Sequence, residues 1–83
     1  GVSIGQKMVD EFIVYTETKT MGTKTTVVRC VLRNGFEIVE STGCVDEKNY
    51  SEKIGYEICM GKIKDKIWEL LGFLLQTAWK GIQ

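Results

Sequence analysis

Three cysteines are the side chains in this sequence with the most reactive chemistry. Cys30, Cys44 and Cys59 could act as nucleophiles or metal ligands, but none of them shares the Cys-x-x-Cys spacing of metal and redox sites. The sequence also contains no histidine, the commonest metal ligand and general base. A cysteine nucleophile would then need a lysine or a helix N-terminus to form its thiolate. We therefore predict reduced, packed thiols, no enzyme activity, no metal and no cofactor.

Six other residues are candidates for binding. Four are cations, two at the predicted first turn and two further along the sheet, where they could contact an anion or a phosphate, although solvated turns have the same composition. Two are aromatic residues, which mark a partner surface when their side chains are exposed. The candidates are Lys19, Lys24, Arg29, Arg33, Phe36 and Trp79.

The composition of the chain narrows its class of fold and of partner. The chain has 83 residues, 43% of them apolar, which predicts a single small globular domain over residues 1–83. Eleven basic residues balance eleven acidic ones, so nucleic acid is disfavoured as a partner. The longest apolar run, from Trp68 to Trp79, is too short to span a bilayer, and no signal peptide is recognisable. We expect no membrane association.

A β-hairpin is the clearest structural signal in the chain. Two β-branched runs between Thr25 and Cys44 flank Asn34-Gly35, which predicts a two-residue type I′ turn. A further strand is predicted over residues 11–20, joined to the hairpin by a turn at Met21-Gly22. The resulting registers pair Val31 with Ile38, Arg29 with Glu40, Cys30 with Val39, Tyr15 with Val28, Ile13 with Cys30, Phe12 with Val31 and Lys19 with Lys24.

These registers predict a sheet with two apolar faces. One face would carry Ile13, Tyr15, Val28, Cys30, Leu32 and Val39, and the other Phe12, Val14, Val27, Val31, Phe36 and Ile38, together with an Arg29–Glu40 ion pair. Small antiparallel sheets usually leave one face polar. We therefore expect the C-terminal half of the chain to cover one face, and an N-terminal segment or a second subunit to cover the other.

The second half of the chain predicts helix. A polar connection after Cys44 can hold one helical turn, and Ser51 is a candidate N-cap. Apolar residues then recur at spacings of three and four up to Ala78. Glycines at 55, 61 and 72 are expected to allow close packing of helix on sheet. From Trp68 onward little polar surface remains, so either Gly72 ends the helix and a second one folds back, or this segment is buried in a subunit interface.

The predicted architecture is therefore an α+β domain. A three-stranded antiparallel meander is followed by one long or two shorter C-terminal helices packed on one face, and we expect a homo-oligomer, most simply a dimer. Residues 1–7 have two interpretations: an addition made in cloning, with Met8 near the native start, or a short helix. In the helix, Ser3 and Gln6 would form a capping box, and Ile4, Met8 and Phe12 would share a face.

The order of several short motifs resembles a family of short tailed-phage proteins of unknown function. The shared elements cover about Thr26 to Leu75, and two positions depart from the family pattern: Glu69 replaces a usual proline and Leu71 a usual acidic residue. The resemblance implies a phage origin and action in the host bacterial cytoplasm, and it brings no catalytic residues. The motifs are Leu32-Arg33-Asn34-Gly35-Phe36, Ser41-Thr42-Gly43-Cys44-Val45-Asp46, Asn49-Tyr50, Ile54-Gly55, and Lys66-Ile67-Trp68 with Leu70, Gly72, Phe73 and Leu75.

Two functional hypotheses follow. The first is a non-enzymatic phage accessory protein that binds and inhibits a host factor, such as a component of antiviral defence. The alternative is an oligomer that sequesters a small anionic ligand, such as a signalling nucleotide, with Lys or Arg at subunit edges and an aromatic side chain for base stacking.

Overall fold

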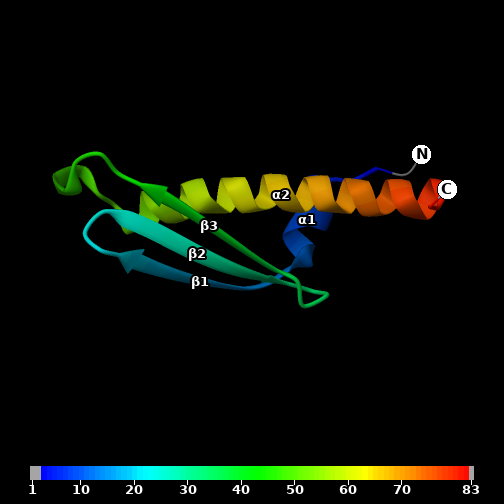
Figure 1. Ribbon diagram of the computed structural model, residues 1–83, viewed down its shortest axis with the longest axis horizontal. Helices are drawn as coiled ribbons and strands as arrows, with labels where there is room; N and C mark the ends of the chain where they lie inside the picture. Colours follow the sequence, from blue (N-terminus) through cyan, green and yellow to red (C-terminus); the bar gives the residue numbers. More distant parts are fainter. Residues whose placement is uncertain (1–2, 83) are drawn as a thin grey trace.

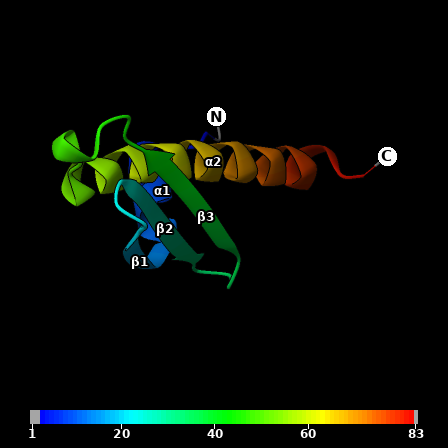
Figure 2. The same ribbon diagram turned by 60° about the vertical axis from the view of Figure 1, so that its left-hand side comes forward.

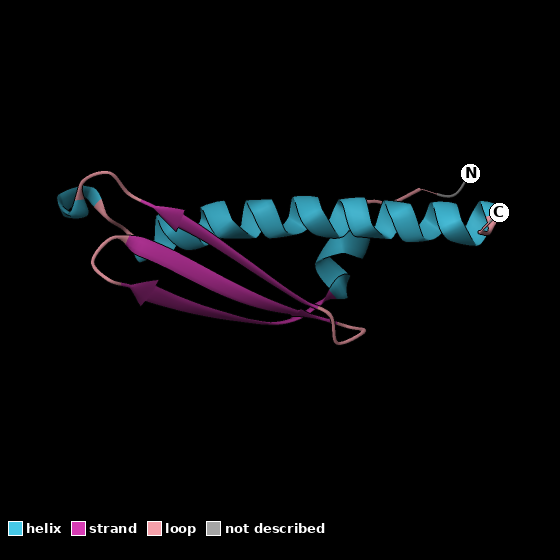
Figure 3. Cartoon of the chain, in the orientation of Figure 1, coloured by secondary structure: helices cyan, strands magenta, loops and turns pink. Residues whose placement is uncertain are grey.

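The protein folds as a short helix, a three-stranded antiparallel sheet and one long helix (Figure 1, Figure 3). The computed structural model describes residues 3–82. Strand order is β1-β2-β3, so the sheet is a meander, and the predicted α+β class is confirmed. The elements are α1 (Gln6–Phe12), β1 (Ile13–Met21), β2 (Thr25–Leu32), β3 (Glu37–Gly43), the 3-10 turn η1 (Glu47–Asn49) and α2 (Glu52–Lys80).

The hydrophobic core lies between α2 and one face of the sheet, which we call the inner face. Side chains of a strand alternate between its two faces, and every second residue of β2, from Thr26 to Leu32, is buried. Helix α1 adds Val9 to the same core and lies next to α2 (Figure 1, Figure 2). The core residues are Val9, Val28, Cys30, Leu32, Ile38, Cys59, Ile63, Ile67 and Leu71.

Helix α2 is continuous over 29 residues. Its N-cap is Ser51, as predicted, and the Ser51 hydroxyl accepts a hydrogen bond from the Ile54 amide at 3.2 Å. Gly72 does not end the helix, so the two-helix alternative is wrong. A proline at position 69, which the resemblance would favour, would remove a backbone donor and clash with the preceding turn. Glu69 stands there instead, and the helix runs on to Lys80.

The predicted register of β2 and β3 is wrong by one residue. Cys30 lies opposite Ile38, and Arg29 opposite Val39. The Leu32 amide donates to the Phe36 carbonyl at 2.8 Å, so Leu32 and Phe36 face each other. The turn between these strands therefore holds three residues, 33–35. A type I′ turn would need positive φ at Asn34 as well as Gly35. Among the described residues only glycines have positive φ, with Gly35 at 87°, and the Asn34 side chain instead accepts from the Phe36 amide.

The predicted register of β1 and β2 is wrong by three residues. Met21 lies opposite Thr25, so the turn spans residues 22–24, and Gly22 takes up the left-handed conformation with a φ of 72°. Tyr15 consequently lies opposite Val31, and Lys19 opposite Val27 rather than Lys24.

These two shifts redistribute side chains between the faces of the sheet. Tyr15 and Val39 do not join Val28, Cys30 and Leu32 on the inner face but lie on the opposite one. Ile38 and Glu40 move the other way, toward α2, where Glu40 pairs with Lys66 at 3.6 Å. The predicted Arg29–Glu40 ion pair is therefore wrong.

The N-terminal segment forms a helix, but not with the predicted details. Gly5 occupies the N-cap position of α1 without a side-chain hydrogen bond, so the capping box of Ser3 and Gln6 is not formed. Val9 is fully buried while Met8 is 45% exposed. Gly1 and Val2 lie outside the described residues. Because α1 packs beside α2, it does not cover the second face of the sheet.

Candidate interaction surfaces

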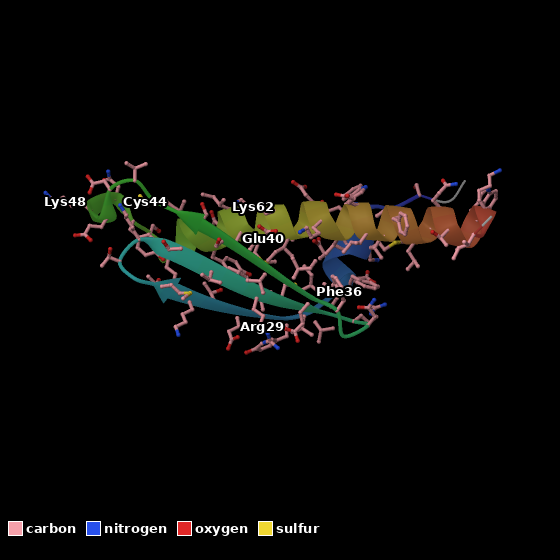
Figure 4. All side chains as sticks on the ribbon, in the orientation of Figure 1. Arg29, Phe36, Glu40, Cys44, Lys48 and Lys62 are labelled. Atoms are coloured by element: carbon pink, nitrogen blue, oxygen red, sulfur yellow. The ribbon has the colours of Figure 1, made fainter. Side chains whose placement is uncertain are left out.

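The side of the sheet that faces away from α2 is an uncovered mixed surface, which we call the outer face. No other segment of residues 3–82 packs on it, and its apolar members Tyr15 and Val39 are 52% and 59% exposed. Figure 4 shows Arg29 on this side, directed away from α2. The outer face consists of Tyr15, Glu17, Lys19, Met21, Thr25, Val27, Arg29, Val31, Glu37, Val39 and Ser41.

Arg29 is held at the centre of the outer face by two carboxylates. Its Nε donates to Glu37 Oε1 at 2.7 Å, and its Nη1 lies 3.5 Å from Glu17 Oε1. The hydrogen bond and charge of Arg29 lower the pKa of Glu37, and Glu37 in turn raises the pKa of Arg29. The guanidinium is thus engaged within the chain rather than free for an anionic ligand.

The Glu37 carboxyl should therefore titrate below the ordinary range of a glutamate. Because its pKa is lowered in the folded state, the ion pair contributes to stability fully above the ordinary glutamate pKa, and this contribution is lost as the pH falls through the lowered value. In an NMR pH titration, Arg29→Met should raise the Glu37 midpoint toward its ordinary value. Lys19→Met, which removes a cation from the same face, is the control, and an unchanged midpoint in Arg29→Met would contradict the assignment.

A second surface is an apolar groove of about 200 Å³ between the β2–β3 turn and α2. Phe36 forms its edge on the turn, and Phe73 and Leu74 form its edge on the helix. These three side chains are 53%, 74% and 58% exposed. Exposed apolar patches of this kind mark interaction sites in soluble proteins.

The six predicted binding residues do not form one site. Lys19 and Arg29 share the outer face. Lys24 lies at the other end of the sheet, where its Nζ donates to the Val45 carbonyl at 2.9 Å. Trp79 is 71% exposed near the end of α2.

Arg33 and Phe36 come from the β2–β3 turn beside the groove. Arg33 Nη2 donates to the Glu11 carbonyl at 2.9 Å, and its guanidinium lies 5.9 Å from the ring centroid of Phe12, another groove residue. Sequence reasoning missed the outer-face position of Tyr15 and Val39 because that position depends on the register. No local sequence signal reports it.

The thiols are mostly part of the packing. Cys30 and Cys59 are fully buried, as predicted for packed thiols, and burial raises the pKa of both. Cys44 is partly buried, and its Sγ donates to the Asp46 carbonyl at 3.1 Å.

Within residues 3–82, acidic and sulfur side chains nowhere gather in a group that could hold a metal ion. No helix in this part of the chain is long and apolar enough to cross a bilayer.

A partly buried polar cluster joins the other end of the sheet to the start of α2. The Tyr50 hydroxyl lies 2.7 Å from the hydroxyls of both Thr20 and Thr26, and Thr26 is fully buried. Gly55 packs directly on Thr26. Two of the motifs noted in the sequence, Asn49-Tyr50 and Ile54-Gly55, meet here and have a structural explanation. Their partners on β1 and β2 are too distant in sequence to be recognised from spacing.

Comparison with known proteins identifies the family of the chain. No curated protein and no solved structure matches it significantly. The model of the Phage protein (N4 Gp49/phage Sf6 gene 66) family matches residues 4–79, which include every element of the fold except the last residue of α2. The chain therefore belongs to the Phage protein (N4 Gp49/phage Sf6 gene 66) family.

Proposed function

We propose that this phage protein is a non-enzymatic accessory protein that binds and inhibits a host protein, a component of antiviral defence, in the bacterial cytoplasm. The observation that carries the proposal is the outer face. It presents exposed Tyr15 and Val39 around an arginine whose position is fixed by two carboxylates. Tyrosine and arginine are enriched among the residues that dominate binding energy at protein interfaces.

The charges on the outer face indicate what kind of partner it fits. Two carboxylates, Glu17 and Glu37, balance two cations, Lys19 and Arg29. A locally neutral surface gives no steering toward a phosphate-rich partner. It suits a protein surface with an apolar centre and charges of both signs around it.

Sequestration of an anionic ligand has less support. Three of the four candidate cations, Lys24, Arg29 and Arg33, bind oxygen atoms of the chain itself, and they lie on separate parts of the surface. A catalytic role for the buried thiols also has little support, because burial favours the protonated form of Cys30 and Cys59.

The proposal predicts that one charge on the outer face abolishes target binding. Val39→Lys places a further cation on this face, opposite Arg29, and Val45→Lys is the matched control, because Val45 is 95% exposed in the loop after β3 and lies off the face. Both variants should fold, since neither valine is buried. In affinity capture from host lysate, wild type and Val45→Lys should retain the same host protein, and Val39→Lys should lose it at least about tenfold, which corresponds to about 1.4 kcal/mol.

The captured protein must also be inhibited. Purified host protein should lose its activity when wild type or Val45→Lys is added in stoichiometric amount, and keep it with Val39→Lys. Capture of no host protein by wild type, or equal capture by all three proteins, would show that the outer face is not a target-binding surface. A melting shift of wild type with a nucleotide would instead favour sequestration.

A further inference from the structure

The chain exposes more surface than its mass requires. Its accessible surface area is 6013 Å², whereas a compact monomer of 9.4 kDa exposes about 5,000 Å². Its radius of gyration is 15.3 Å, against about 12 Å for a compact chain of 83 residues. The excess area, roughly 1,000 Å², is similar to the area of about 800 Å² that each partner buries in a standard protein interface.

The last turns of α2 contribute to this excess, because they extend past the β2–β3 turn into solvent (Figure 1). The α2 residues that pack on the sheet lie four apart, from Gly55 to Leu71. Four residues make slightly more than one helical turn, so this row of side chains winds gradually around the helix axis. A second line has alternating spacings of four and three, the spacing by which helices pack along one another. This line, which we call the seam, runs through Ile63, Ile67, Leu70, Leu74 and Thr77.

The sheet covers the seam only as far as Ile67. Ile63 and Ile67 are fully buried under the sheet, but Leu70 and Leu74 are 39% and 58% exposed. Both line the apolar groove, whose opposite edge is Phe36. The part of the seam up to Ile67 is thus buried within the chain, and the part from Leu70 onward, which we call its exposed half, leaves Leu70 and Leu74 open to solvent along the groove.

We propose that a second copy of this chain covers the exposed half of the seam. The two α2 helices pair antiparallel about a two-fold axis near Leu74. The seam side of the last turns of each helix, at Thr77 and Ala78, then lies against the groove of the other copy, beside Phe36 and Leu70. Each groove is completed only by the partner copy.

A second copy fits because the surface is complementary to itself. The chain carries both the groove and the helix end that protrudes beyond it, so one two-fold rotation fills both grooves at once. The seam beyond Ile67 carries no charge, and Thr77 and the neighbouring Ala78 are small enough for two helices to approach closely. A parallel pair would place the protruding ends against each other, leave both grooves open and align the two helix dipoles.

The test is the mass of the protein in solution. Light scattering at high micromolar concentration should give twice the 9.4 kDa of one chain for wild type. Leu74→Lys puts a charge in the seam and should give the monomer mass. Trp79→Lys is the matched control, because Trp79 is 71% exposed but lies five residues after Leu74, about 140° around the helix, and it should remain dimeric.

Circular dichroism should show both lysine variants folded, since neither side chain belongs to the core. A monomeric wild type, a dimeric Leu74→Lys, or a dimer that only Trp79→Lys dissociates would each overturn the proposal.

Cross-linking tests the orientation of the helices. In a Cys44→Ser background, which leaves only buried native thiols, Leu70→Cys alone should not form an inter-chain disulfide, whereas a mixture of Leu70→Cys and Ala78→Cys should. Efficient cross-linking of Leu70→Cys to itself would overturn the antiparallel arrangement. Because Leu70 and Ala78 lie on α2 and not on the outer face, this result is independent of binding to a host protein.

Discussion

Replacing Gly55 with alanine should destabilise the fold by about 1–3 kcal/mol, the range expected when an extra methyl group is forced into a packed core. A Cβ atom at this position would lie 2.0 Å from Thr26 Oγ1 and 2.7 Å from Thr26 Cβ. Thr26 is fully buried on the central strand, so it cannot swing away from the methyl group. Helix α2 would have to shift off the sheet along the line on which its core residues pack. In a domain whose whole stability is about 5–15 kcal/mol, this is a large fraction.

Two other glycines of the same helix provide the control. Nothing lies within 4 Å of a Cβ at Gly61 or Gly72. Alanine there should stabilise the helix by about 0.5–1 kcal/mol, because glycine loses more backbone entropy on folding. Urea denaturation of the three variants at one protein concentration measures both effects. Thr26→Ala combined with Gly55→Ala removes the 2.0 Å contact but keeps the 2.7 Å one, so it should rescue only part of the loss. Equal changes in the free energy of unfolding for Gly55→Ala and Gly61→Ala would contradict the close approach of α2 to β2 at Gly55.

The glycines of α2 also show which packing details can be predicted from the sequence. Close packing of helix on sheet was predicted for all three positions; it is confirmed at Gly55 and wrong at Gly61 and Gly72, where a Cβ would meet open space. Helical periodicity says that a glycine lies in a helix, but not which turn approaches the sheet most closely. The cap at Ser51, by contrast, depends only on neighbouring residues, and the sequence predicted it correctly.

The faces of the sheet were harder to predict than its strands. Strand existence follows from β-branched runs, whereas pairing depends on turn length, and a shift of one residue moves every side chain of a strand to the other face. Asn34-Gly35 favours a two-residue turn, yet the Asn34 side chain bonds to the Phe36 amide and the turn takes three residues. Because the outer face follows from the register, Tyr15 and Val39 could not be assigned to it from the sequence.

Removal of the Tyr50 hydroxyl is the second change with a large expected effect. Tyr50→Phe should cost about 1–3 kcal/mol, the penalty for leaving a buried polar group without a hydrogen-bond partner. Thr26 is fully buried, and its Oγ1 has the Tyr50 hydroxyl, 2.7 Å away, as its side-chain partner. Thr20, the other partner of Tyr50, keeps its hydrogen bond to Glu52 and is only partly buried, so the loss falls mainly on Thr26.

Tyr56→Phe is the matched control for this change. Tyr56 lies on α2, is only partly buried, and its hydroxyl makes no hydrogen bond with another described residue, so its loss should change the free energy of unfolding by less than about 0.5 kcal/mol. The urea midpoint should fall for Tyr50→Phe alone, with an unchanged slope. Equal midpoints for the two variants would mean that water satisfies Thr26. The loop between β3 and α2 would then be held by packing, and not by the hydrogen bond that joins Tyr50 to the central strand.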